Sequence, residues 1–539
     1  MKKLSFIFFI YCQLLLPIAN SFSQPVQNFV DYYDKEQKQK RSEGKFVNGF
    51  EDGEWKFWFK NGKIKELSNY QNGKLHGKII IFYENGNKQN EGFFKRNLMD
   101  STYSEWYETG QLKITGLYDE KVKVDLWTFY FPNGKKFKEE KYFNGHPKLA
   151  NSWDTAGNPL VINGSGKHVE VFENNNKEAE CEYLDSMKSG NCILFYDNRK
   201  KKEEGKYMKG NHDGEWIFWH SNGNILKKAT YKNGELDGEF IQYFSNAKKE
   251  AEGNYQNSKK NSYWIFYREN GNKDFEGEFK EDVQHGKWIY YYSTSEKESF
   301  GNFREGKRDS IWIFLYKTGE KWKEGFYKND LKNEKWTTLF ENGKKLQEGN
   351  YINGKQEGLW TSWYEDGKKK DEGFYKNGLM EGEWNGWYPN GNKNYEGKIK
   401  DGLKEGAWTF WFVDGKLREK GFYEKGKKQG SWEFYYELGG KESEGNFVNE
   451  KHSGRWTYYY QCPECKTGET GQKMRHENLI DGKLEGKTTV WFPGGQIQSE
   501  THFKNGIPNG EWKQYNKNGM LTMDRIYENG NIVKDKLKD

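Results

Sequence analysis

Apolar and polar residues alternate in short runs along the chain, and these runs recur with a period of 24 residues. The period is marked by two rows of residues, a glycine and a tryptophan eleven residues later, as in Gly349 and Trp360. Tryptophan recurs without a gap at Trp264, Trp288, Trp312, Trp336, Trp360, Trp384, Trp408, Trp432 and Trp456. Self-similarity at a fixed period of this length is typical of repeat proteins.

We number each repeat from its glycine, which is position 0. Repeats begin at residues 44, 68, 92, 116 and 140, at 181 and every 24 residues to 445, and at 477, 501 and 525. That makes twenty repeats, the last of them truncated. An ordinary globular core would not place its aromatic residues at such fixed positions, so we interpret the chain as an array.

Each repeat is predicted to form two short strands joined by tight turns. In the repeat 349–372, Asn353-Gly354 and Asp366-Gly367 separate runs of alternating residues. Such pairs favour two-residue type I′ turns, which need positive φ at both central residues. The resulting register places Trp360 opposite Gly373. We therefore expect the ring at position 11 to cover the glycine of the next repeat. If position 0 also pairs with position 11 of its own repeat, tryptophan and glycine alternate in a continuous row across the sheet.

Both faces of the predicted sheet carry aromatic residues, because positions 11 and 13 share one face and positions 12 and 14 the other. The sequence therefore predicts an all-β fold, an elongated single-layer antiparallel sheet of about twenty 24-residue β-hairpin repeats. If position 11 is structural, the rings left for binding lie at position 14, on the opposite face. They are Trp219, Trp363, Trp387 and Trp411.

The pattern from Gly205 to Trp216, repeated from Gly349 to Trp360, resembles the variant class of MORN repeats (membrane occupation and recognition nexus). The resemblance extends from residue 44 over nearly the rest of the chain. Several repeats depart from it by lacking the glycine at position 9, among them those that carry Ser101, Asp125, Ser262, Ser310 and Glu334 there. The resemblance implies a stack of β-hairpins that serves protein or lipid contacts. Bacterial members of the variant class are often described as antitoxin-like.

The predicted organisation has five parts: a signal peptide at 1–23, a leader at 24–43, a short array at 44–145, an irregular adaptor at 146–180 and a long array at 181–539 with an insertion at 461–475. Lys2 and Lys3 precede an apolar run, and small residues precede a cleavage point before Gln24. We therefore expect an exported protein, located in the periplasm, on the outer surface or in the medium.

Composition and charge argue against several classes of function. The chain is 31% charged, but its 18% aromatic content is too high for a disordered protein. The formal net charge of +6 is spread through every repeat, so a nucleic-acid partner is not expected. No stretch after the signal peptide approaches the roughly 20 apolar residues of a transmembrane helix.

Four cysteines are candidates for disulfide bonds. Cys181 and Cys192 occupy positions 0 and 11 of one repeat, so a cross-strand bond forms if these positions face each other. Cys462 and Cys465 form a CxxC in the insertion, where a local disulfide is favoured. A zinc site there would need two further ligands, and only His452 and His476 are near in sequence.

No set of residues predicts catalysis or a cofactor, because each loop histidine is explained by its place in a repeat. Four of them, His76, His212, His285 and His452, precede position 9 of their repeats. We therefore expect a non-catalytic exported scaffold that binds a protein partner in the cell envelope or at the cell surface. Two alternatives remain: an antitoxin or immunity protein that neutralises a toxin, and a repeat protein that binds glycans or the cell wall.

Overall fold

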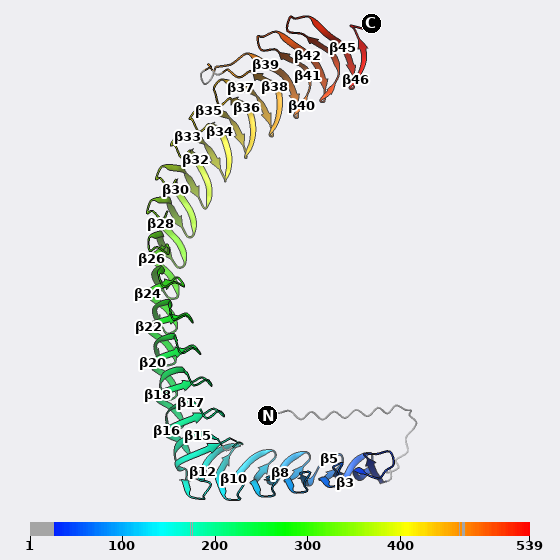
Figure 1. The fold of residues 1–539 in the computed structure, drawn as a ribbon, viewed down its shortest axis with the longest axis vertical. Coiled ribbons are helices and arrows are strands. Elements are labelled where there is room, and N and C mark those ends of the chain that lie inside the picture. The colour runs from blue at the N-terminus through cyan, green and yellow to red at the C-terminus, as the bar shows by residue number, and fades with distance from the viewer. Residues whose placement is uncertain (1–25, 173, 175, 463, 466–468, 539) are drawn as a thin grey trace. The chain divides into compact units, whose positions relative to one another are not determined.

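The computed structural model describes residues 26–538 apart from 173, 175, 463 and 466–468. The predicted signal peptide at 1–23 therefore lies outside the described residues. The chain divides into two units, the first comprising 26–239 with 245–247 and the second 240–244 with 248–538. Every regular element within the described ranges is a β-strand (Figure 1).

The first unit contains the strands β1 to β19 and the residues of β20 up to Glu239, whereas the rest of β20 belongs to the second unit. They are β1 (Gln27–Tyr32), β2 (Lys40–Val47), β3 (Phe50–Trp58), β4 (Ile64–Gln71), β5 (Lys74–Leu75), β6 (Gly77–Phe82), β7 (Lys88–Lys95), β8 (Leu98–Trp106), β9 (Leu112–Asp119), β10 (Val122–Tyr130), β11 (Lys136–Phe143), β12 (His146–Trp153), β13 (Pro159–Ile162), β14 (Ser165–Val171), β15 (Lys177–Leu184), β16 (Met187–Phe195), β17 (Lys201–Met208), β18 (Asn211–Trp219), β19 (Ile225–Lys232) and β20 (Glu235–Tyr243).

The second unit contains the remaining strands. They are β21 (Lys249–Gln256), β22 (Lys259–Tyr267), β23 (Lys273–Lys280), β24 (Val283–Tyr291), β25 (Lys297–Arg304), β26 (Lys307–Leu315), β27 (Lys321–Lys328), β28 (Leu331–Leu339), β29 (Lys345–Ile352), β30 (Lys355–Trp363), β31 (Lys369–Lys376), β32 (Leu379–Trp387), β33 (Lys393–Lys400), β34 (Leu403–Trp411), β35 (Leu417–Glu424), β36 (Lys427–Tyr435), β37 (Lys441–Val448), β38 (Lys451–Tyr459), β39 (Lys473–Ile480), β40 (Lys483–Leu484), β41 (Gly486–Trp491), β42 (Ile497–Lys504), β43 (Ile507–Pro508), β44 (Gly510–Tyr515), β45 (Leu521–Glu528) and β46 (Asn531–Asp535).

Within each unit the strands form an open antiparallel sheet that is one layer thick. Consecutive strands are hydrogen-bonded as hairpins, for example β29 with β30 and β30 with β31. Extensive contacts join only strands that are neighbours along the chain, apart from places where a very short strand intervenes. The predicted fold class is therefore confirmed.

The turn predicted at Asn353-Gly354 is present in the expected form. Both residues have positive φ, 49° at Asn353 and 82° at Gly354. A type I′ turn requires this conformation at both central positions, and its twist matches that of the flanking strands.

The turn predicted at Asp366-Gly367 has a different form. Gly367 N–H donates to Tyr364 O at 2.9 Å, and Tyr364 N–H donates to Lys368 O at 2.8 Å. Of the central pair only Gly367 has positive φ, 92°, which is the pattern of a type I turn closed by a glycine bulge. The predicted register nevertheless holds, with Trp360 opposite Gly373, because a second irregularity beside Trp363 shifts the pairing back.

The tryptophan at position 11 is held against the sheet by a glycine and a hydrogen bond. A Cβ added at Gly349 would lie only 2.2 Å from Cδ2 of the Trp360 indole. The indole Nε1–H donates to Asn350 O at 3.2 Å. The ring therefore lies over the glycine of its own repeat, and our expectation that it covers the next repeat's glycine is wrong. The carbonyl oxygen that fixes it belongs to its own repeat.

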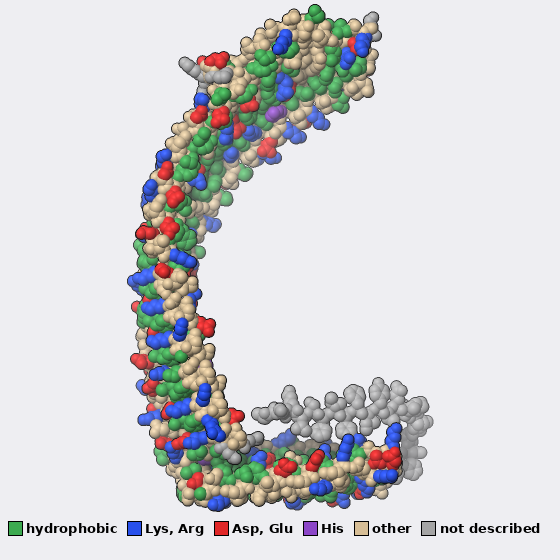
Figure 2. All heavy atoms as spheres, viewed as in Figure 1, with side chains coloured by type: hydrophobic (Ala, Val, Ile, Leu, Met, Phe, Trp, Pro, Cys, Tyr) green, Lys and Arg blue, Asp and Glu red, His purple; other side chains and the backbone are tan. Residues whose placement is uncertain are grey.

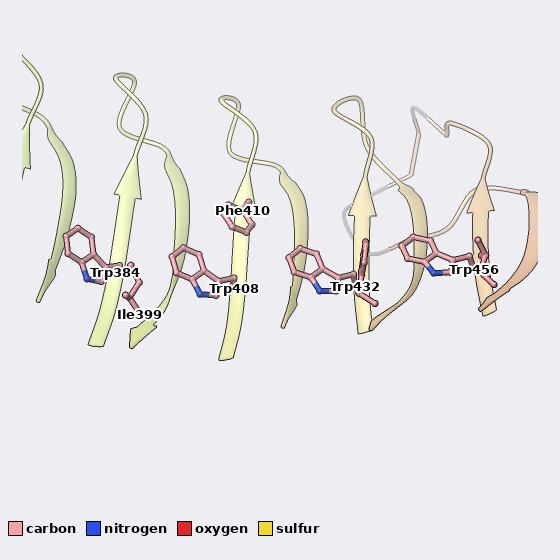
Figure 3. Close-up of a cluster of buried hydrophobic side chains, with 8 residues drawn as sticks. Trp384, Ile399, Trp408, Phe410, Trp432 and Trp456 are labelled. Carbon is pink, nitrogen blue, oxygen red and sulfur yellow. The ribbon is translucent and has the colours of Figure 1, made fainter. Parts of the chain in front are cut away.

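Tryptophan and glycine do alternate in a continuous row across the strands. Gly373 pairs with Trp384, and Trp384 pairs in turn with Gly397. Figure 3 shows the rings of Trp384, Trp408, Trp432 and Trp456 at the same place in successive repeats. Position-11 tryptophans that face a glycine are at most 7% exposed; they are Trp55, Trp127, Trp216, Trp264, Trp288, Trp312, Trp336, Trp360, Trp384, Trp408, Trp432 and Trp456. We call the side of the sheet that carries this row the Trp face, and the opposite side the second face.

Hydrogen bonds between turns fix one repeat to the next. Tyr364 Oη–H donates to Trp387 O at 2.8 Å, and Tyr388 Oη–H makes the same bond to Trp411 O at 2.8 Å. Both bonds join residues 23 positions apart. Across the insertion, Tyr460 Oη–H donates to Trp491 O at 2.8 Å over 31 positions, so the stacking of repeats continues in spite of the eight extra residues.

Two segments that break the period still belong to the sheet. The segment predicted as an irregular adaptor, 146–180, contains β12, β13 and β14, each paired with its neighbours. In the predicted leader, β1 pairs with β2, and the Phe29 ring lies 5.5 Å from Trp55. The spacing of the sequence is interrupted here, but the ladder of strands is not.

Position 9 adopts the left-handed conformation in repeats with and without glycine. Gly358 has φ 73°, and the residues that replace glycine follow it, with φ 57° at Glu334 and 64° at Ser310. An L-residue pays roughly 1–2 kcal/mol for this conformation. The replacements therefore carry local strain that the surrounding pairing maintains.

Replacing Glu334 by glycine should raise the free energy of unfolding by about 1 kcal/mol, because it removes the Cβ from a left-handed position. The matched variant Gly358→Ala should lower it by a similar amount. Urea denaturation of both variants measures this. A Glu334→Gly protein no more stable than the wild type would contradict the strain.

Adding a methyl group beneath an indole should also destabilise the array. Gly349→Ala should cost about 1–3 kcal/mol, as overpacking does. The cost should be much smaller in a protein that already carries Trp360→Ala, since the clash is then absent. A double-mutant cycle followed by thermal and urea unfolding measures the coupling; additive effects would show that ring and glycine do not interact.

Candidate functional site

The four rings predicted for binding lie on the second face but are only half exposed. Trp219, Trp363, Trp387 and Trp411 are all of intermediate exposure. A lysine of the preceding repeat covers each ring: Lys345 Nζ lies 5.4 Å from the Trp363 centroid, and the other three distances are 5.5, 5.6 and 5.9 Å. Cation–π contacts of this kind stabilise exposed sites by roughly 0.5–1 kcal/mol.

The covering lysines also pair with glutamates of the same face. Lys345 Nζ lies 2.9 Å from Glu348 Oε2, and Lys335 Nζ lies 3.0 Å from Oε1. Burial opposes ionisation of Glu348, but hydrogen bonds from both lysines hold its pKa below the usual value. These rings are therefore part of a lysine–glutamate network and are not free aromatic surfaces.

Exposed aliphatic and phenyl side chains lie next to this network. Leu359 and Phe374 face each other across β30 and β31 and are 46% and 48% exposed. Phe422, at the position equivalent to Phe374, is 55% exposed. We call Leu359, Phe374, Phe422 and the neighbouring Trp363 the apolar strip. Leu359, Phe374 and Phe422 were not predicted from the sequence, because the residues at positions 1 and 10 vary between repeats.

On the Trp face, a cation or histidine often covers the buried indole. Lys428 Nζ lies 3.9 Å from the Trp432 centroid, and the rings of His452 and Trp456 are 3.7 Å apart. Burial, with Lys428 and Arg475 nearby, lowers the pKa of His452. The sequence signal for this row was a basic residue seven places after the glycine, which the high overall charge obscured.

The cysteines form two bonded pairs. Cys181 and Cys192 are Cα partners across β15 and β16, 2% and 1% exposed, and their sulfur atoms are bonded. They take the place of a glycine and a tryptophan. Cys462 and Cys465 are bonded within the insertion, with Cα atoms 5.3 Å apart.

The part of the chain that the structure describes contains no group of three His, Cys, Asp or Glu side chains placed to hold a metal ion. His452 packs on Trp456, whereas His476 is paired with Thr457. An open hollow of about 420 Å³ lies over the first strands; it is lined by Asn28, Phe29, Val30, Glu43, Gly44, Lys45, Glu54 and Lys56.

Charges of both signs are mixed over the surface. Figure 2 shows lysine, arginine, aspartate and glutamate side chains interspersed along the visible face. Ion pairs within one repeat recur, such as Lys369 with Glu372 at 2.6 Å. Among the described residues, no helix has the length and apolarity to cross a membrane.

Comparison with known proteins identifies the repeat. The MORN repeat variant matches residues 51–72, 75–96, 99–120, 213–233, 356–377 and 484–505. The resemblance seen in the sequence is therefore confirmed at six places. No curated protein matches the chain.

Among solved structures, the complex TcdB2-TccC3-Cdc42 is 8% identical with a TM-score of 0.13, and the match covers 93% of this chain and 35% of that one. A Tc holotoxin pore from Photorhabdus luminescens is 9% identical with a TM-score of 0.12, covering 93% and 34%. The chain thus spans about a third of the length of these structures. Similarity at this level gives no information about function.

The protein should become less stable as the pH falls, because histidines on the Trp face have lowered pKa values in the folded state. Because the folded state lowers the pKa of His452 below its ordinary value of 6.5, both states are neutral above that pH. As the pH falls below it, the unfolded chain binds the proton more readily, so stability is lost. Unfolding midpoints between pH 7.5 and 5.5 should decline less steeply for His452→Gln than for the wild type. An equal pH dependence of the two unfolding midpoints would contradict the lowered pKa of His452.

Proposed function

Because the chain carries MORN-variant repeats, we propose that it is a non-catalytic exported scaffold that binds a protein partner in the cell envelope or at the cell surface. The scaffold part rests on the repeats themselves, which offer an extended surface of equivalent positions. The exported part rests on the charged and apolar start of the sequence before Gln24.

The apolar strip is the observation that supports a protein partner. Leu359, Phe374 and Phe422 are each about half exposed, although no packing of the sheet requires an apolar side chain there. Exposed apolar groups rimmed by charges are typical of interaction sites. The rim here consists of the lysine–glutamate pairs beside Trp363 and Trp387.

The chemistry of the rim adds to this interpretation. Lys369 Nζ is bonded to Glu372 at 2.6 Å and lies 5.6 Å from the Trp387 ring. Because these charges are already paired within the protein, they should contribute more to the orientation and specificity of a bound partner than to its affinity. We therefore expect the apolar strip to provide most of the affinity, as buried apolar anchors do in other interfaces.

The proposal is tested by cross-linking the native exported protein, identifying the captured partner and titrating the purified pair by calorimetry. The double variant Leu359→Ser/Phe374→Ser should weaken binding about tenfold or more. Val448→Ser is the matched control, since Val448 is also exposed (45%) but lies outside the strip. The captured chain should begin at Gln24.

Equal affinity of the wild type, the double variant and the control would exclude the apolar strip as the binding site. Capture of a glycan and no protein would contradict the proposed partner class. A chain that retains Met1 and stays inside the cell would contradict export.

A further inference from the structure

Three cations gather on the Trp face of the second unit. Arg308, Lys323 and Lys332 come from the consecutive strands β26, β27 and β28. Arg308 is paired with Phe303, Lys323 with Phe314 and Lys332 with Tyr327, so all three stand among the rings of the Trp face. We call these three residues the cation cluster.

Aromatic rings hold each member of the cluster. The Arg308 guanidinium lies 4.2 Å from the Tyr327 centroid and donates to Tyr327 Oη at 3.1 Å. Lys332 Nζ lies 4.5 Å from the Trp336 ring. Lys323 Nζ lies 4.5 Å from the Phe314 ring and 3.9 Å from Trp322. Rings of neighbouring strands thus place the three positive groups on one surface.

The cluster is short of negative charge. Asp330 pairs with Arg308 at 3.1 Å, but no described carboxylate forms an ion pair with Lys323 or Lys332. Three cations and one carboxylate leave a local charge of 3 − 1 = +2. Burial, together with the neighbouring cations, lowers the pKa of both lysines.

Several lysines elsewhere on this face have a carboxylate nearby, although Lys188 near Glu203 and Lys404 near Glu419 form no ion pair with it. Lys428 Nζ lies 2.8 Å from Glu419 Oε2, and Lys138 Nζ lies 3.0 Å from Glu170 Oε1. Beside Lys323 the row continues instead through the uncharged Thr338, Gln347 and Ser362. An acidic ligand would therefore find two lysines here with only cations beside them.

An exposed indole adjoins the cluster. Trp322 is one of two tryptophans outside the regular positions and is 38% exposed, whereas the tryptophans over glycine are at most 7% exposed. It is the extra residue of a β-bulge, because Phe314 pairs with Lys323 and Leu315 pairs with Lys321. Beside its ring lie the flexible Lys323 side chain and the Tyr316 ring, whose centroid is 6.2 Å away.

We infer that the cation cluster and Trp322 form a binding subsite for an acidic polysaccharide containing uronic acids. A uronate carboxylate pairs with Lys323 and Lys332, and the apolar face of the sugar ring packs on the Trp322 indole after Lys323 turns toward the carboxylate. Hydroxyl and amide groups of Thr338 and Gln347 supply hydrogen bonds beside it. The exposed ring favours this ligand over an acidic peptide, which needs the cations alone. The site is on the opposite face from the apolar strip and is independent of the protein partner.

Calorimetric titration of the full-length protein tests the subsite with three uronate polymers: galacturonate, alginate and hyaluronate oligomers. Methyl-esterified galacturonate has the same rings without charge, and poly-L-glutamate has the charge without the rings. We expect the wild type to bind at least one uronate, to lose that binding on esterification or in high salt, and to bind polyglutamate more weakly.

Lys323→Gln, Lys332→Gln and Trp322→Ala should each weaken uronate binding about tenfold. Lys428→Gln is the matched control, because Lys428 is on the same face but already paired with Glu419; its affinity should equal that of the wild type. Thermal unfolding checks that each variant is folded, and the esterified ligand tests the wild type without any substitution. Absence of binding to all three uronates would overturn the inference, as would tight polyglutamate binding that Trp322→Ala leaves unchanged.

Discussion

The contact between an indole and a bare glycine backbone is the interaction on which this structure depends. A sheet of one layer has no second layer to bury its side chains, so its apolar contacts must form along its own surface. Trp360 lies flat enough on Gly349 that no Cβ fits between them, and its Nε1–H is bonded to the neighbouring carbonyl. Tyr351, 5.2 Å from the same ring at 89°, closes the edge. The indole, which is the largest side chain, is therefore buried by groups of its own repeat, and every further repeat adds another contact of this kind.

Repeats that depart from the pattern show how closely ring and glycine depend on each other. Where position 0 is Thr501, Trp512 keeps the indole hydrogen bond, to His502 O at 3.0 Å, but it is only half buried. In the repeat with Ser68, a smaller aliphatic side chain, Ile79, replaces the ring, and both residues are buried. Cys181 and Cys192 replace the contact by a covalent bond. A tryptophan at position 11 is thus buried only where position 0 is glycine, and where position 0 is Ala229 the smaller Phe240 ring is buried instead.

Sequence predicted the strands, the register and the Asn353-Gly354 turn because each follows from local chemistry. It could not decide the form of the Asp366-Gly367 turn, since a type I′ turn and a type I turn with a bulge both place Gly367 at positive φ. The direction of the Trp360 ring was predicted wrongly, because glycines flank it on both sides and the predicted pairing with Gly373 favoured the next repeat. The hydrogen bond to Asn350 O selects its own repeat. The members of the cation cluster were hidden among abundant lysines, and only their distances to rings and carboxylates set them apart.

The positions that stabilise the sheet differ from the positions that we propose for binding. Packing restricts positions 0 and 11, so these vary little from one repeat to the next, and at position 9 every residue other than glycine must adopt a strained positive φ. Positions 1, 7 and 10 point away from the tryptophan row or lie above it. There the chain changes from Lys332 to Gln356 to Met380 at position 7, and from Phe374 to Lys398 to Phe422 at position 1. An array built in this way can acquire a different local surface in every repeat while its fold stays constant. Recognition should therefore be sought where the repeats differ, at Arg308 to Lys332 on one face and Leu359 to Phe422 on the other, since the residues that define the period are already occupied in holding the sheet together.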